Sequence, residues 1–319
     1  MFEIKYNKNK IVLSVSRRTD IPAFYLSWFM RGIERGYFDV VNPYNQKVRH
    51  VPADTSTVHT IVFWSKDFGR FLEEKAGETL QQKGYHLFFN YTLNSHLPLL
   101  EPNVPPLKKR MEHLDELCRR FGPRSVSWRF DPICFYQLDG GPMKTNLSDF
   151  LQIANRAGEA GIQRCITSFM DHYPKIKRRA VTESGLKFLD PSLEHKVDTL
   201  LWMNVILRPM GIELHTCCER DVANRLPAGS GIKESACVPN NFLVGLYGGQ
   251  LSFKRDPGQR RPKGCRCQVS VDVGSYREHP CGHSCLYCYA NPIQKAPGWQ
   301  RERVKASPDN YITHRPICD

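Results

Sequence analysis

Three cysteines near the C-terminus have the residue type and the spacing to hold a metal centre. Cys281, Cys285 and Cys288 follow a C-x₃-C-x₂-C pattern, and one short loop can turn all three thiolates toward one point. Three such ligands can bind three irons of a cubane cluster and leave the fourth iron open to a small molecule, whereas electron-transfer clusters are closed by four cysteines. The spacing therefore predicts a [4Fe-4S] cluster with one open iron.

Two other uses of these cysteines remain open. Zinc also binds closely spaced cysteines, and His283 lies within the loop as a possible fourth ligand. The chain has 12 cysteines, an even number that would also allow disulfides. Zinc ligands usually come as two separated pairs, so the x₃ then x₂ spacing favours the iron–sulfur cluster.

A second group of cysteines lies upstream of the loop, where Cys217, Cys218, Cys237, Cys265 and Cys267 remain. We expect four of them, Cys217, Cys237, Cys265 and Cys267, to approach one another because they fall at or between two neighbouring strands. Alternation along an extended segment puts the Cys265 and Cys267 sulfurs on one side. Four thiolates would close a second cubane cluster. A four-cysteine zinc site or unliganded cysteines are the alternatives.

The composition predicts a folded cytoplasmic protein. Hydrophobic residues make up 41% of the 319 residues, enough for a core. No stretch approaches the 18 or so apolar residues of a membrane helix, and the first residues lack the apolar run of a signal peptide. We therefore expect no membrane partner. In a reducing compartment, metal binding or catalysis explains so many cysteines better than disulfides do.

The formal net charge of +13 leaves the partner undecided. A basic chain favours polyanions such as RNA or DNA, but a soluble enzyme with solvated Lys and Arg side chains has the same composition. Two segments concentrate the charge, Lys175–Arg179 and Lys254–Lys263. They would contact phosphates if the substrate is a nucleic acid, whereas Arg17 and Arg129 would bind a small anion.

Eight strand patterns alternate, for the most part, with helical patterns, which predicts an α/β fold of the TIM-like (β/α)₈ barrel type. The predicted strands are Ile11–Ser16, Phe38–Val41, Thr60–Trp64, His86–Asn90, Ser125–Arg129, Arg164–Ser168, Ile212–Thr216 and Cys267–Asp272. Residues 46–58 read as a loop or hairpin. One domain would span residues 1–291, with a Cys-rich insertion at 217–267 and the cluster loop at 281–288 after the last strand. Residues 292–319 would form a C-terminal tail.

Polar side chains follow most of these strands, where a barrel of this type gathers its catalytic residues. Some of them must pair with one another, for instance Arg129 with Asp131, because buried polar groups need partners. The candidates for catalysis are Arg17, Arg18, Asp20, Lys66, Arg129, Asp131, Asp171 and Lys175.

Several segments resemble the domain-of-unknown-function family 1848. They are Ser14–Tyr25, Asn42–Asn45, Val62–Lys66, Trp128–Ile133, Phe169–Lys175, Thr216–Glu219, Gly264–Cys267 and Cys281–Asn291, and the resemblance runs from about Ile11 to Asn291. The cysteine loop with its following Tyr-Ala-Asn also resembles the cluster loop of radical S-adenosylmethionine enzymes. The resemblance implies an iron–sulfur, radical-enzyme-like protein without a settled reaction.

The resemblance to radical S-adenosylmethionine enzymes also implies a permuted site. Their cysteine loop follows the first barrel strand, whereas here it follows the last, and in a closed barrel the eighth strand lies beside the first. Their Gly-Gly-Glu segment, which binds the methionine amino group, is replaced here by Arg17-Arg18-Thr19-Asp20. Asp20 would replace the Glu, and Arg17 or Arg18 would hold the methionine carboxylate. Tyr287 and Asn291 are further candidates for cofactor binding.

The resulting prediction is a radical S-adenosylmethionine-like [4Fe-4S] enzyme acting on an unidentified substrate, with a flavodoxin or ferredoxin as electron donor. One alternative is an iron–sulfur nucleic-acid-binding or redox protein that does not cleave S-adenosylmethionine. A zinc-stabilised hydrolase is the other.

Overall fold

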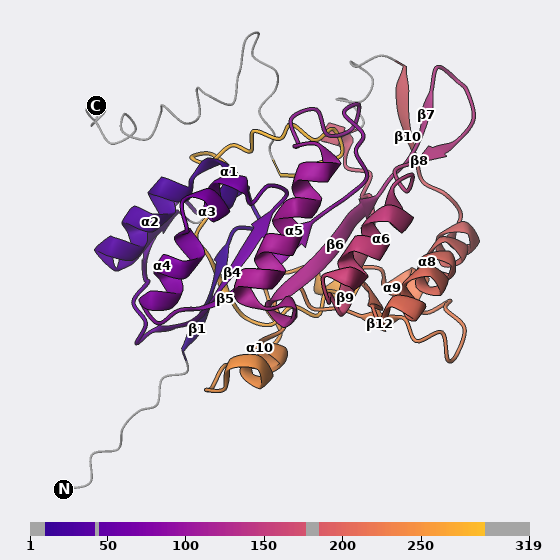
Figure 1. The fold of residues 1–319 in the computed structure, drawn as a ribbon. Helices are drawn as coiled ribbons and strands as arrows, with labels where there is room; N and C mark the ends of the chain where they lie inside the picture. The colour runs from indigo at the N-terminus through magenta and orange to yellow at the C-terminus, as the bar shows by residue number, and fades with distance from the viewer. Residues whose placement is uncertain (1–9, 42–44, 177–184, 291–319) are drawn as a thin grey trace, which may run out of the picture.

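An eight-stranded sheet in which every neighbouring pair is parallel forms the framework of the protein (Figure 1). The computed structural model describes residues 10–41, 45–176 and 185–290. Along the sheet the strands follow the order β12-β11-β9-β6-β5-β4-β1-β13. Their bounds are β1 Ile11–Val15, β4 Val58–Ser65, β5 His86–Thr92, β6 Val126–Ile133, β9 Arg164–Phe169, β11 Glu213–Thr216, β12 Lys233–Glu234 and β13 Val271–Asp272.

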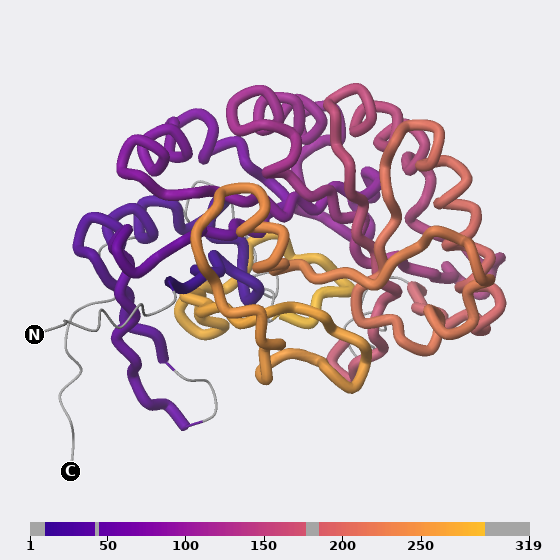
Figure 2. Tube along the Cα trace, turned by 90° about the horizontal axis from the view of Figure 1, so that it is seen from below, coloured from indigo at the N-terminus to yellow at the C-terminus, as the bar shows by residue number. Residues whose placement is uncertain are grey.

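Most helices line one side of this sheet, and the C-terminal part of the described chain, orange to yellow in Figure 2, runs along the other side with α10. The helices are α1 Ile21–Phe24, α2 Leu26–Arg35, α3 Gly69–Glu73, α4 Ala76–Gln82, α5 Leu107–Phe121, α6 Phe150–Glu159, α8 Leu193–Leu207, α9 Arg220–Ala223 and α10 Asn240–Tyr247, with short 3₁₀ turns η1 Pro123–Ser125, η2 Arg208–Met210 and η3 Arg261–Lys263.

Both faces of the central strands are buried, which is why they appear in the sequence as continuous apolar runs. On β5, Leu87 and Phe89 belong to the main core with the helices. Phe88, between them, points the other way and packs with Val238 and Leu243 of the Cys-rich insertion. The insertion therefore covers the second face of the sheet.

The predicted strand Phe38–Val41 does form, but it is wrong as a member of the main sheet. It lies in β2 (Tyr37–Val41), which pairs antiparallel with β3 (Val48–Pro52) in a separate hairpin. Phe38 packs against α2 at Gly32, where an added Cβ would lie only 2.0 Å from the ring. The apolar side chain thus serves helix packing, and β12, from the insertion, takes the eighth place in the sheet.

The last strand lies beside the first, as predicted. β13 pairs in parallel with β1 through Leu13 with Val271 and Ser14 with Asp272. No pairing among the described strands joins β12 to β13, so the parallel α/β sheet is confirmed while its closure into a barrel is not shown. The predicted strand Cys267–Asp272 is shorter than expected, because only Val271–Asp272 pairs with β1.

A second, antiparallel sheet stands beyond the end of β6 and follows the order β10-β7-β8. Its strands are β7 Phe135–Leu138, β8 Lys144–Thr145 and β10 Leu186–Leu189. Within the described ranges, no helix combines the length and the apolar character needed to cross a membrane. Asn291, the predicted tail 292–319 and the end of the basic segment Lys175–Arg179 lie outside the described residues.

Candidate functional site

The loop that carries Cys281, Cys285 and Cys288 follows β13 and is tied to the segments that follow β1 and β5. Tyr25 Oη donates a hydrogen bond of 2.7 Å to the Pro280 carbonyl. Further along, the Leu286 amide donates to the Leu100 carbonyl at 2.9 Å. The loop thus sits at the carboxyl edge of the parallel sheet, where α/β proteins commonly bind their ligands.

The three thiols of this loop share one partly buried region. Cys285 is buried at 3% exposure, while Cys281 and Cys288 are partly exposed. Burial raises the pKa of Cys281 and of Cys285, and the nearby Cys288 adds to both shifts. Lys66 lies close enough to Cys285 to oppose its shift. Three neighbouring thiols with a cation beside them are chemically suited to an anionic metal–sulfur centre.

Asp20 connects three parts of this site through four hydrogen bonds. Its carboxylate caps α1 by accepting from the Ala23 amide at 3.0 Å, and it also accepts from Ser65 Oγ at 2.7 Å and the Lys66 amide at 2.8 Å. His283 Nε2 lies 2.8 Å from Asp20 Oδ2. Asp20 was predicted to bind a cofactor amino group. Its carboxylate is instead hydrogen-bonded to protein groups, among them His283 of the cysteine loop.

His283, the possible zinc ligand, has both ring nitrogens directed at protein oxygens. Besides Asp20, it faces the Asn103 carbonyl, which is 3.3 Å from Nδ1. The ring is 1% exposed and packs edge-on against Phe24 at a centroid distance of 4.7 Å. His283 therefore orients the loop, and nothing in its position supports the zinc alternative.

A buried polar network lies beneath Cys285. Lys66 Nζ is 2.9 Å from Glu101 Oε1, and the same oxygen accepts from Tyr287 Oη and from Asn94 Nδ2, the latter at 2.9 Å. Burial alone would raise the pKa of Glu101, but Lys66, Arg110 and Tyr287 hold it at about 2. Despite its own burial, Lys66 has a raised pKa because of Glu101 and Cys285. The network keeps a charged ammonium group next to the loop.

The two arginines predicted to hold one carboxylate point to different places. Arg18 Nη1 donates to the Gly274 carbonyl at 2.7 Å, just before the cysteine loop. Arg17 instead reaches Ser270 Oγ at 3.1 Å, and the pKa of its guanidinium, although burial lowers it, is raised by Cys267 and Asp272. Arg18 is therefore near the first cysteine group, and Arg17 near the second.

The second cysteine group contains five thiols rather than the predicted four. Cys217 Sγ lies 3.8 Å from Cys218 Sγ and 3.5 Å from Cys237 Sγ. Cys265 and Cys267 pack against Cys217 and Cys237 in the same buried cluster, with the partly buried Cys218 beside them. Adjacent residues of a strand point to opposite faces, so Cys217 and Cys218 would not be expected in one group. Cys218 has a left-handed φ of 63°, which ends this alternation. We term these five residues the five-thiol group.

Two arginines and a tryptophan border the five-thiol group. Arg129 Nη1 donates to Cys237 Sγ at 2.6 Å, and its Nη2 pairs with Asp131. Arg17 and Arg129 lie over the Trp64 ring, 5.1 and 5.2 Å from its centroid. Burial opposes both charges of the Arg129–Asp131 pair, yet the pair raises the pKa of Arg129 and lowers that of Asp131. The predicted Arg129–Asp131 pairing is confirmed.

The donor chemistry of both cysteine groups suits thiophilic metals, but the side chains are not arranged around a metal. In the residues that the structure describes, no group of three or more Cys, His, Asp or Glu could hold a metal ion as it stands. In the five-thiol group, Cys217 Sγ lies only 3.8 and 3.5 Å from the sulfurs of Cys218 and Cys237. A cluster would have to move these thiols apart.

Two other predicted catalytic residues serve the edges of the site. Lys175 Nζ donates to the Tyr289 carbonyl at the end of the cysteine loop. Asp171 pairs with Arg260 and, at 2.5 Å, with Lys263. These ion pairs engage two cations of the basic segment Lys254–Lys263, which reduces the charge that this segment can offer to a phosphate backbone.

Glu101 is a site residue that sequence reasoning did not select, whereas Asp272 ends the last predicted strand. Glu101 is the only acidic residue between His96 and Pro106, a proline-rich and mostly apolar stretch, and that isolation was the available signal. Asp272 accepts hydrogen bonds from Ser14 Oγ, Ser16 Oγ and the Arg17 amide at 2.9, 2.6 and 2.8 Å. It locks the end of β1 to β13.

Comparisons with known proteins identify a family but no activity. The model of the family described as "Domain of unknown function (DUF1848)" matches residues 12–290. No curated protein matches the sequence. Among solved structures, a D-hydantoinase is similar with 14% identity and a TM-score of 0.30, over 56% of this chain and 39% of that one. The carboxyl transferase domain of Rhizobium etli pyruvate carboxylase with 3-hydroxypyruvate gives 10% identity and a TM-score of 0.28, over 81% of this chain and 45% of that one.

These structural likenesses carry no argument about fold or activity, because both TM-scores are low. The chain spans less than half of each of those two proteins.

The bonds of Asp20 predict that its loss weakens the whole edge of the sheet. Asp20→Ala removes a helix cap and leaves Ser65 and His283 without their buried partner, which should lower the free energy of unfolding by about 2–4 kcal/mol. Urea denaturation measures the change. Asp198→Ala, at an exposed position on α8, is the matched control and should have little effect. Equal stabilities of the two variants would contradict the conclusion that Asp20 holds the three parts of the site together.

Proposed function

Because the chain belongs to the DUF1848 family, whose name gives no activity, we propose its function from the site: an iron–sulfur enzyme of the radical S-adenosylmethionine type, with a [4Fe-4S] cluster on Cys281, Cys285 and Cys288. The observation that carries the proposal is the parallel pairing of β13 with β1. It puts a C-x₃-C-x₂-C loop at the carboxyl end of β1, where the permuted order of the motif requires it to be.

The surroundings of the loop suit a cluster that must be shielded from water on one side. Cys285, Leu286 and Tyr287 pack in an apolar group with Leu100 and Met170. A hydrophobic shell of this kind controls solvent access and the redox potential of a metal site. Cys281 and Cys288, which are partly exposed, leave the other side accessible to a small molecule.

The chain's own residues supply charge and orientation. A bound cluster would supply the electron for reductive cleavage of S-adenosylmethionine. Lys66, held by Glu101 and Tyr287, places a positive charge beside Cys285, which favours the anionic thiolate form. Arg18 lies next to the start of the loop, over Tyr276 at 5.9 Å, and is the better placed of the two arginines for a ligand carboxylate. A flavodoxin or ferredoxin would deliver the electron.

The five-thiol group supports a second metal centre as part of the same proposal. Four thiolates would close a cubane cluster suited to electron transfer, and five lie in or beside one buried cluster here. Arg17 and Arg129 would offset its negative charge. A four-cysteine zinc site fits the same residues, so metal analysis decides between them.

The first cluster is tested by Cys285→Ser in protein purified and reconstituted without oxygen. We expect the variant to lose about four irons per chain, the content of one cubane cluster, together with the acid-labile sulfide. Cys118→Ser, at another buried thiol far along the sequence on α5, is the control and should keep both. The same iron content in the two variants would contradict the assignment of a cluster to this loop.

The second centre is tested by Cys237→Ser. This variant should contain about four irons fewer than the unmodified chain, the content of one cubane cluster. The spectrum of the first cluster should persist, because the two groups use different cysteines. If iron is unchanged and stoichiometric zinc disappears instead, the five-thiol group holds zinc. If neither metal changes, Cys237 is not a ligand.

Cofactor binding is tested on the reduced protein by electron paramagnetic resonance. S-adenosylmethionine should shift the signal of the first cluster, because its amino and carboxylate groups would complete the open iron. 5′-Methylthioadenosine lacks those groups and should leave the signal unchanged. Arg18→Gln should weaken the shift by removing a charge-assisted hydrogen bond. A signal insensitive to saturating S-adenosylmethionine would favour the redox-protein alternative.

A further inference from the structure

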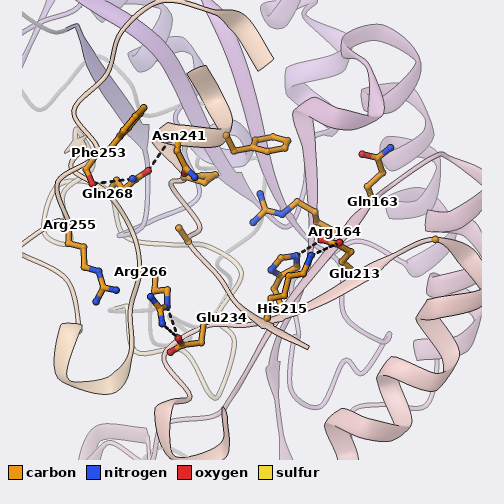
Figure 3. A pocket seen from close by; sticks show the side chains of 15 residues that line it. Gln163, Arg164, Glu213, His215, Glu234, Asn241, Phe253, Arg255, Arg266 and Gln268 are labelled. Atoms are coloured by element: carbon orange, nitrogen blue, oxygen red, sulfur yellow. Dashed lines mark hydrogen bonds and ion pairs between the residues drawn. The ribbon is translucent and has the colours of Figure 1, made fainter. Parts of the chain in front are cut away.

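A cavity of about 710 Å³ opens at the opposite end of the strands from the cysteine loop (Figure 3). Arg164 and Glu213, which are the first residues of β9 and β11, line it together with His215. The insertion closes it from the other side with Phe253 and Arg255 among others. The cavity therefore lies between the amino ends of these strands and the Cys-rich insertion.

The charges around this cavity do not balance. Two of its cations are neutralised, since Lys233 Nζ pairs with Glu213 at 2.6 Å and Arg266 pairs with Glu234. Arg164 has only Ser235 Oγ at 3.3 Å and the Phe242 ring at 5.2 Å as side-chain partners. Neither Arg164 nor Arg255 makes an ion pair with any residue that the structure describes. Two positive charges thus face the cavity without a counterion.

His215 adds a second, independent sign of a ligand. It is 7% exposed and lines the cavity, yet its Nδ1 makes no hydrogen bond within the described chain. Its Nε2 has only Glu213 Oε2 nearby, at 3.4 Å. Burying a polar group without a partner costs free energy that a ligand atom would recover.

Figure 3 shows how these groups face one another. Arg164 and His215 approach the hollow from the sheet side, and Arg255 and Arg266 from the insertion. The volume falls in the range of small-molecule sites and is larger than an inorganic anion needs. Phe253, with 54% of its surface exposed, and Phe242 add apolar wall for the rest of a ligand.

We propose that this cavity binds a small organic phosphate, with Arg164 and Arg255 holding the phosphate group, His215 offering a hydrogen bond and the two phenylalanines contacting the organic part. A phosphate monoester carries a charge of about −1.5 to −2 at pH 7, which matches two unpaired guanidinium groups. Arginine also binds phosphate oxygens through two parallel N–H donors.

The environment of Arg164 agrees with this assignment. Burial lowers the pKa of its guanidinium from the usual value, and Cys237 and Glu213 offset that effect only in part. A dianion in the cavity would stabilise the charged form. The cavity is separate from the cysteine loop, so this proposal does not depend on the cluster proposed for that loop.

Calorimetric titration of the full chain tests it with two phosphate monoesters, AMP and glucose 6-phosphate. At least one should bind with a stoichiometry of one, and its phosphate-free parent, adenosine or glucose, should not. Arg255→Gln should weaken that binding about tenfold or more, the worth of a lost charged hydrogen bond. Because Arg255 is exposed, this variant should fold even if Arg164→Gln does not. Arg31→Gln, at an exposed site on α2, is the control and should bind as the unmodified chain does.

Three results would overturn the proposal. One is the absence of binding of both monoesters at millimolar concentration, and another is equal affinity in the Arg255 and Arg31 variants. The third is binding of citrate or of an RNA oligomer without binding of either monoester, which would assign the cavity to a carboxylate or to a nucleic acid. The same titration on Cys285→Ser protein should give the affinity of the unmodified chain. The binding result can therefore be interpreted even if the iron–sulfur assignment of the loop is wrong.

Discussion

The pairing of β13 with β1 is the constraint on which the site depends, and Asp272 holds it in place. This carboxylate accepts from Ser14, Ser16 and the Arg17 amide, so it joins residues more than 250 positions apart in the chain. Closing so long a loop carries an entropic cost that grows slowly with length, and several buried hydrogen bonds at one point offset it. Once the pair is formed, the following loop has little choice of position. Asp20 then fixes that loop to β1 through His283.

The parallel sheet was predictable because its strands are buried on both faces and therefore read as apolar runs followed by polar residues. The same signal misplaced Phe38–Val41, since a short apolar run cannot show whether its partner is a sheet or a helix. In the structure that partner is α2 at Gly32. The eighth place went to Lys233–Glu234, two charged residues at an edge, which carry no apolar pattern. Closure of the sheet depends on contacts between such edges, and no local pattern encodes them.

The two cysteine groups differ in how far sequence could define them. The loop group lies within eight residues, so its spacing alone predicts convergence of Cys281, Cys285 and Cys288. The five-thiol group draws on three separate segments, and its membership depends on tertiary folding. Alternation along a strand would point Cys217 and Cys218 apart, and the left-handed backbone of Cys218 breaks that rule. Glu101 was omitted because its partner Lys66 is 35 residues away.

The distribution of buried charge separates the two ends of the molecule. At the carboxyl edge three cations face an anionic or sulfur partner: Lys66 faces Glu101, Arg129 faces Asp131 and Cys237, and Arg260 faces Asp171. At the amino edge Arg164 and Arg255 lack such partners in the described chain. A net charge of +13 does not by itself indicate a polyanionic partner, because solvated Lys and Arg side chains on the surface give the same charge. Arg164 and Arg255 share one cavity, and its size favours a small anion over a polymer.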